Sequence, residues 1–235
     1  LHTHVGVDNV TVHYQEIDAI NSSQEYKVQA RTYPYTGLDW IDQRTVHSAL
    51  IMGSKPSTKY LIRVFYNNQF WTNAIYKTLS DDPTVPIRMI NAGDSGYTKP
   101  AIELTKIIAT LKPDVYFIGG DIAYDDNMPA CAYTWDYYLK LYGSLTSTIG
   151  YLMPIVLTVG NHDVGLNEMP GINITINEYG PAYLLYFPQH YDRNANFEIM
   201  KTIPPINRRR TFFYHNFANM HYLSLDSGYV NTFNG

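Results

Sequence analysis

Three side chains of metal-binding type follow apolar runs in the middle of the chain, and each comes directly after a glycine. They are Asp94, Asp121 and Asn161. Carboxylate and amide oxygens suit hard or borderline divalent and trivalent metal ions. One carboxylate can bridge two ions about 3.5–4 Å apart. We therefore predict a two-metal site in which Asp121 is the bridge, Asp94 serves one ion and Asn161 serves the other.

The elements that position these side chains can be read from the apolar runs themselves. The runs are typical of buried parallel strands, and the segments between them are typical of helices. Right-handed crossovers place parallel strands side by side, so their carboxyl ends meet at one edge, where ligands of open α/β sheets bind. The predicted strands are residues 87–92, 115–119 and 151–159, and the predicted helices are 101–112 and 134–145.

The first predicted helix, residues 101–112, opens after Pro100, whose fixed φ suits a first helical turn. Its larger apolar side chains fall on one stripe, as in an amphipathic helix. They are Leu104, Ile107, Ile108 and Leu111.

Residues 1–80 differ from the rest of the chain, because they consist of short strand-like segments separated by turn-prone residues. In residues 59–67, apolar side chains alternate with period two, which is typical of a half-buried strand. Regular spacing of such strands predicts an all-β sandwich with a scaffold role. The stretch KPSTKYLIRV resembles the fibronectin type III pattern, with Tyr60 as its corner tyrosine. The five predicted strands are residues 10–15, 25–33, 46–53, 59–67 and 70–79.

A polar, proline-bearing linker, SDDPTVP at residues 80–86, marks the predicted domain boundary. We therefore expect a fibronectin type III-like domain at residues 1–80 and an α/β domain at residues 86–235.

The order of the motifs, GD, GD and then GNHD at 160–163, resembles the calcineurin-like metallophosphoesterase superfamily. Most members begin with D-x-H, whereas this chain has Gly96 in place of the histidine. The second motif reads GGDIAYDD, with Tyr124 three residues after Asp121. The pairing of GDxG with GDxxY is similar to purple acid phosphatases, in which that tyrosine is a metal ligand.

The resemblance implies a β-sandwich with flanking helices and a mixed metal pair. Asp94, Tyr124 and the bridging Asp121 would hold Fe(III), because three anionic oxygens favour a trivalent ion. Asn161 and Asp121 would hold Fe(II), Zn or Mn. The alternative for Tyr124 is that it is simply one of the chain's 22 tyrosines.

The resemblance also implies the catalytic role. His162 would face the substrate and assist the leaving group, while Asp163 would either orient His162 or hydrogen-bond the loop. The implied reaction is hydrolysis of phosphate monoesters, an acid phosphatase activity, with in-line attack by water whose pKa two metal ions lower. Two alternatives stay open: another metallophosphoesterase activity, such as a nucleotidase or phosphodiesterase, and an inactive binding or surface fragment.

Family members supply three more histidines downstream, in VxxH and GHxH motifs, and neither motif occurs after His162 in this chain. The metallophosphoesterase fold is therefore expected to be incomplete at its C-terminus. A second chain or a C-terminal segment would supply these ligands. Leu1 is not a native start, so a trimmed N-terminus is expected. By analogy with purple acid phosphatases, we expect a secreted or lysosomal/vacuolar protein, and a homodimer remains open.

Composition is consistent with these expectations. Hydrophobic residues make up 45% of the chain and charged residues 16%, as in folded domains, and the net charge of −4 gives no sign of a nucleic-acid partner. No apolar run is long enough to span a membrane. Cys131 is the single cysteine. N-x-S/T triplets at Asn9, Asn21 and Asn173 indicate a glycoprotein. The basic run Arg208–Arg210 either attracts an anionic substrate or is solvated.

Overall fold

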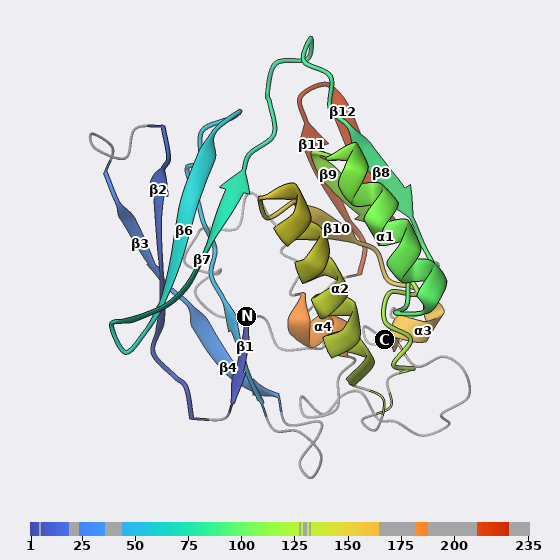
Figure 1. Cartoon of the computed structure of the whole chain (residues 1–235), viewed down its shortest axis with the longest axis horizontal. Coiled ribbons are helices and arrows are strands. Elements are labelled where there is room, and N and C mark those ends of the chain that lie inside the picture. The colour runs from blue at the N-terminus through green and yellow to red at the C-terminus, as the bar shows by residue number, and fades with distance from the viewer. Residues whose placement is uncertain are drawn as a thin grey trace.

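The computed structural model describes residues 1–4, 6–18, 24–35, 44–126, 128, 131, 133–164, 182–187 and 211–225 (Figure 1). The triplets at Asn21 and Asn173 and the run Arg208–Arg210 lie outside these residues. Asn9 lies within them and is exposed. No helix in the described ranges is long and apolar enough to cross a membrane.

The N-terminal part consists of two antiparallel sheets, at the left of Figure 1. Their strand orders are β1-β5-β4 and β3-β2-β6-β7. The strands are His2–His4 (β1), Val10–Glu16 (β2), Tyr26–Gln29 (β3), Arg31–Tyr35 (β4), Arg44–Ser48 (β5), Lys59–Tyr66 (β6) and Gln69–Lys77 (β7).

The period-two alternation in β6 produces the predicted buried face. β6 pairs with β2 so that Tyr14 stands opposite Ile62, and both side chains join Val12 and Tyr60 in one apolar cluster. The predicted strand 25–33 is wrong as a single element, because it breaks at Ala30. The Ala30 N–H donates to Val10, and the halves on either side belong to different sheets.

The C-terminal part contains the predicted parallel sheet, in the order β10-β9-β8. A hairpin and two short helices follow it (Figure 1). The elements are Met89–Ala92 (β8), Lys99–Leu111 (α1), Val115–Ile118 (β9), Tyr133–Ile149 (α2), Ile155–Leu157 (β10), Asn161–Val164 (α3), Ala182–Tyr186 (α4), Phe213–Phe217 (β11) and Met220–Ser224 (β12).

Alternate side chains of β9 face two different layers. Tyr116 contacts the cluster formed by α1 and α2, which includes Ala109 and Leu145. Phe117 faces the β11–β12 hairpin, where its ring stacks on Tyr222 at 4.4 Å between centroids. The sheet is therefore covered on both faces, as expected of parallel strands.

The predicted apolar stripe of α1 is only partly buried. Ala109 is buried and Ile108 packs against the same cluster, because this side of the helix meets α2 and the sheet. Leu104, Ile107 and Leu111 remain 59%, 56% and 44% exposed.

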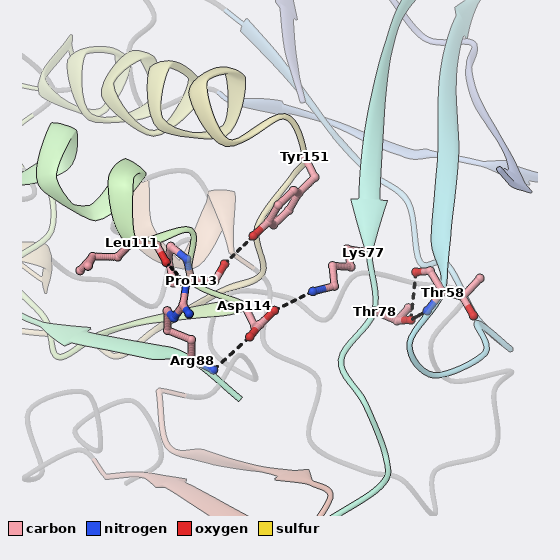
Figure 2. A network of polar contacts seen from close by, with 8 residues as sticks. All are labelled: Thr58, Lys77, Thr78, Arg88, Leu111, Pro113, Asp114 and Tyr151. Carbon is pink, nitrogen blue, oxygen red and sulfur yellow. Dashed lines mark hydrogen bonds and ion pairs between the residues drawn. The ribbon is translucent and has the colours of Figure 1, made fainter. Parts of the chain in front are cut away.

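The two parts of the chain meet in a polar junction beside the linker (Figure 2). Lys77 Nζ, at the end of β7, lies 2.7 Å from Asp114 Oδ1, just before β9. The other oxygen of Asp114 accepts the Arg88 N–H at 3.0 Å, and the Arg88 guanidinium donates to the Leu111 carbonyl. Tyr151 donates to the Pro113 carbonyl at 2.8 Å. The Lys77–Asp114 ion pair therefore joins β7 to the start of β9, and the other contacts stabilise the surroundings of Asp114 within the C-terminal part.

A second part of the junction is more deeply buried. Arg44, which is 7% exposed, forms a bidentate ion pair with Asp136 of α2. The distances from its two terminal nitrogens to the two carboxylate oxygens are 2.6 and 3.1 Å. Val46 of β5 belongs to the same apolar cluster as Trp135 and Ile118. The β1-β5-β4 sheet therefore shares a core with the parallel-sheet part.

Asp114→Asn is expected to lower the free energy of unfolding by about 1 kcal/mol at pH 7, because the ion pair with Lys77 is partly screened by solvent. Burial alone would raise the pKa of Asp114, but hydrogen bonds from Lys77 and the Arg88 N–H outweigh it and lower the pKa. A lowered folded-state pKa gives stability that is present above the unfolded pKa of about 3.9 and is lost as pH falls through the folded value. Urea unfolding of the native protein and of Asp114→Asn at pH 7 measures the loss of stability. The same comparison at pH 3 measures how much of that difference disappears at low pH.

The control is Glu103→Gln, which breaks the exposed pair between Glu103 and Lys106 on α1. It is expected to change stability little at either pH. Equal losses in the two variants would contradict a role for Asp114 in the junction.

Candidate metal centre

The loops that follow β8 and β9 are hydrogen-bonded to each other beyond the ends of the strands. The Asp94 N–H donates to Gly120 at 3.1 Å, and the Ser95 N–H donates to Asp121 at 2.9 Å. The Gly96 N–H donates to Ile122 at 2.8 Å. The first two predicted motifs therefore lie side by side, as their strand order requires.

Asp121 also contacts the loop after β10. Its Oδ1 accepts the backbone N–H of His162 at 3.0 Å. A Cβ on Gly160 would stand only 2.2 Å from the same oxygen, so the glycine leaves the space that the carboxylate occupies. Asp121 thus contacts the first motif through its backbone carbonyl and the third motif through its carboxylate.

Gly160→Ala is expected to lower the free energy of unfolding by roughly 2–3 kcal/mol, because the new methyl would overlap both the carboxylate and the backbone N of Asp121. Thermal and urea unfolding measure the loss. Gly143→Ala is the matched control: it lies inside α2 with nothing within 4 Å of the added Cβ. It is expected to stabilise by about 0.5–1 kcal/mol. Unchanged stability of Gly160→Ala would show that Asp121 does not need this space.

Tyr124 lies against Gly96. Its Oη donates to Asp94 Oδ1 at 2.9 Å. Its ring carbon Cδ2 lies 3.6 Å from where a Cβ on Gly96 would be. Burial, followed by the hydrogen bond to Asp94 and the nearby carboxylates, raises the pKa of Tyr124 to about 12. In this structure the phenol is therefore a neutral donor to Asp94.

Strained backbone conformations gather in these loops. Asp94, Asp121, Tyr124 and Asp126 have φ between 50° and 57°. They are four of the nine non-glycine residues with positive φ in the described ranges. Such conformations cost free energy and concentrate at functional sites, where neighbouring contacts hold them in place.

The carboxylate of Asp163 links the loop after β9 to the loop after β10. It is fully buried. It accepts the N–H groups of Asp121 at 2.8 Å, Ile122 at 2.9 Å and Gly160 at 2.9 Å. Burial raises its pKa to about 6 against the effect of these donors, which lower it. Of the two roles considered for Asp163, the contacts support hydrogen-bonding the loop.

His162 is held by an acidic residue that the sequence reasoning missed. Its Nδ1 lies 2.5 Å from Asp126 Oδ1, and this hydrogen bond raises the pKa of His162. The imidazole also lies against the Tyr124 ring, with 4.7 Å between centroids. The two adjacent aspartates that end GGDIAYDD were the sequence feature that pointed to this contact. They did not indicate which of the two carboxylates would bond to His162.

Asn161 is the first residue of α3, and its side chain is exposed. No three His, Cys, Asp or Glu side chains form a metal-binding group in the part of the chain that the structure describes. A cation here would therefore depend on the phenol of Tyr124 and the amide of Asn161 as well as on carboxylates. This all-oxygen set fits a hard cation.

A comparison with known protein families finds a match in the part of the chain that contains these loops. The sequence model of the family described as calcineurin-like phosphoesterase matches residues 88–233. No curated protein matches the chain in sequence.

A solved structure titled "Structure of PhoD" matches with a TM-score of 0.60 and 15% sequence identity. The match covers 95% of this chain and 46% of that one, so the chain spans about half the length of that structure. At this identity the likeness is one of fold. Because the family's sequence model covers more than half of the residues, the chain belongs to the calcineurin-like phosphoesterase family.

Proposed function

We propose that this chain carries the first part of a binuclear metal centre of purple acid phosphatase type, which hydrolyses phosphate monoesters. One observation carries the proposal: the Tyr124 hydroxyl contacts Asp94 at 2.9 Å while its ring lies over Gly96. The phenol thus stands beside the space where a side chain at position 96 would begin. This placement supports Tyr124 as the replacement for the missing histidine.

We assign Asp94, Tyr124 and Asp121 to a first ion, Fe(III), and Asn161 with the shared Asp121 to a second, Fe(II), Zn or Mn. When bound, such a pair supplies Lewis acidity toward phosphoryl oxygens and lowers the pKa of a water molecule. The placement of Asp121 between the other two motifs supports its role as the bridge.

The chain's own residues then position the substrate and move a proton. Asp126 fixes the imidazole of His162 through Nδ1. We assign Nε2 the donation of a proton to the leaving oxygen of the ester. Asp163 acts indirectly, by fixing the backbone of Asp121 and Gly160.

We also propose that three histidine ligands come from a second chain or a C-terminal segment, because no VxxH or GHxH motif follows His162 in this sequence. The proposed domains are residues 1–80, of fibronectin type III type, and 86–235. The Tyr60 hydroxyl accepts the Lys55 N–H at 2.8 Å, which is the contact a corner tyrosine makes and supports the first assignment. Secreted or lysosomal/vacuolar placement, glycosylation and a homodimer belong to the same proposal.

The test is metal loading followed by hydrolysis. The chain is incubated with Fe(III) together with Fe(II), Zn or Mn, desalted, and analysed for bound metal with Asp121→Asn as the control. It is then assayed on 4-nitrophenyl phosphate and on bis(4-nitrophenyl) phosphate. Metal bound through Asp121 and faster monoester hydrolysis would support the proposal.

The contrary results separate the alternatives. Faster diester hydrolysis would indicate a phosphodiesterase. Metal binding that is unchanged in Asp121→Asn would contradict the proposed set of ligands. Absence of both metal and activity, even when a second chain or C-terminal segment that supplies the three histidines is added, would favour a binding or surface fragment.

A further inference from the structure

A cavity of about 300 Å³ lies between α1 and α2, above β8 and β9. Its walls are largely apolar and include Ala101, Leu104 and Ile108 of α1 and Leu141 and Leu145 of α2. Exposed lining residues, such as Leu104, mark its open side, and Leu145 is buried. This volume is at the lower end of that of small-molecule sites.

A polar group lies in this apolar enclosure without a partner. Tyr138 lines the cavity and is 4% exposed, and its Oη has no hydrogen-bond partner among the described residues. Its electrostatic neighbours are the hydroxyls of Tyr116 and Tyr142, which line the same cavity, and the buried carboxylate of Asp163. Tyr142 already donates to the Met153 carbonyl. Buried hydroxyls are nearly always hydrogen-bonded, so the one on Tyr138 calls for an acceptor that the described residues do not provide.

The charge of an occupant follows from the lining. Among the described lining residues there is no lysine, arginine or histidine, and the one carboxylic acid is Asp94, which is exposed and bonded to Tyr124. Burial of an unpaired charge in such walls is costly, whereas apolar surface gains from leaving water.

We propose that this cavity binds a small neutral molecule, mostly apolar, whose single oxygen hydrogen-bonds to the Tyr138 hydroxyl. Aromatic or short aliphatic alcohols are the chemical class that fits. The inner end of the cavity is made by tyrosines of β9 and α2, and its lining also includes Asp94 and Gly96 of the candidate metal centre. The proposal does not depend on a phosphatase activity.

The experiment uses two matched probes, 4-fluorophenol and fluorobenzene, which differ only by the hydroxyl. Their binding to the chain is followed by the broadening of the ¹⁹F NMR signal during titration. Both are expected to bind, and 4-fluorophenol is expected to bind about fivefold more tightly, because one hydrogen bond contributes about 1 kcal/mol. In Tyr138→Phe that preference is expected to disappear, while fluorobenzene binding is kept.

Two further variants complete the test. Tyr137→Phe removes an exposed hydroxyl on the same helix, outside the cavity, and is expected to change neither probe. Ala101→Phe places a ring into the cavity and is expected to abolish binding of both. Failure of both probes to bind the native chain, or a preference for 4-fluorophenol that survives Tyr138→Phe, would overturn the proposal. If Tyr138→Phe does not fold, binding that persists in Ala101→Phe would overturn it as well.

Discussion

Tyr124→Phe is expected to remove the visible absorption of the iron-loaded protein and to lower its affinity for Fe(III) by about 100-fold. The visible band of such a centre would come from charge transfer between the phenolate and Fe(III), so a ring without oxygen cannot produce it. The pKa of Tyr124 is raised to about 12 in this structure. A nearby trivalent charge acts in the opposite direction and favours the phenolate. Optical titration with Fe(III) measures both the band and the affinity.

The matched control is Tyr97→Phe. Tyr97 is in the loop after β8, but its ring stacks on Tyr137 at 5.2 Å between centroids, away from Asp94. Its removal is expected to leave the band unchanged. A band that persists in Tyr124→Phe would remove Tyr124 from the ligand set, and Asp94 and Asp121 would have to be tested alone.

Asp163→Ala is expected to lower the free energy of unfolding by roughly 3–5 kcal/mol, because it leaves three backbone N–H groups without their acceptor. Asp163 is fully buried, and its three donors come from Asp121, Ile122 and Gly160. Water does not readily replace a carboxylate in such a place. Urea unfolding followed by circular dichroism measures the loss.

Asp163→Asn is expected to recover about half of that loss. An amide keeps one acceptor oxygen but turns an N–H donor toward a backbone N–H. Asp82→Ala is the control, since Asp82 accepts the Thr84 N–H in an exposed loop, where water can substitute. It is expected to have a much smaller effect. Equal losses in the Asp163 and Asp82 alanine variants would show that burial of the acceptor does not matter.

Much of the architecture could be predicted from the sequence because it depends on local patterns. The apolar runs ending at Asp94, Asp121 and Asn161 predicted three adjacent parallel strands, and right-handed crossovers leave little freedom in how such strands are arranged. Period-two alternation likewise predicted the buried face of β6. For these strands, the local pattern of apolar and polar residues is enough to indicate which side chains are buried.

The structure corrected the elements that depend on tertiary packing. The strand expected at 25–33 breaks at Ala30, since its two halves pair with different partners. Three of the four stripe residues on α1 are exposed because α2 determines which side of the helix is covered. The periodicity of a segment does not determine which strands it pairs with or which side of a helix its neighbours cover.

Sequence alone therefore determined the family-type motifs, the parallel sheet and the edge at which its polar residues gather. Tertiary structure alone decided that Asp126 holds His162, that Asp163 holds the loops, and that Tyr124 rests on Gly96. These contacts join residues 28 to 42 positions apart in the chain. They also depend on left-handed backbone conformations at non-glycine residues, which local preferences oppose and only the packed loops impose.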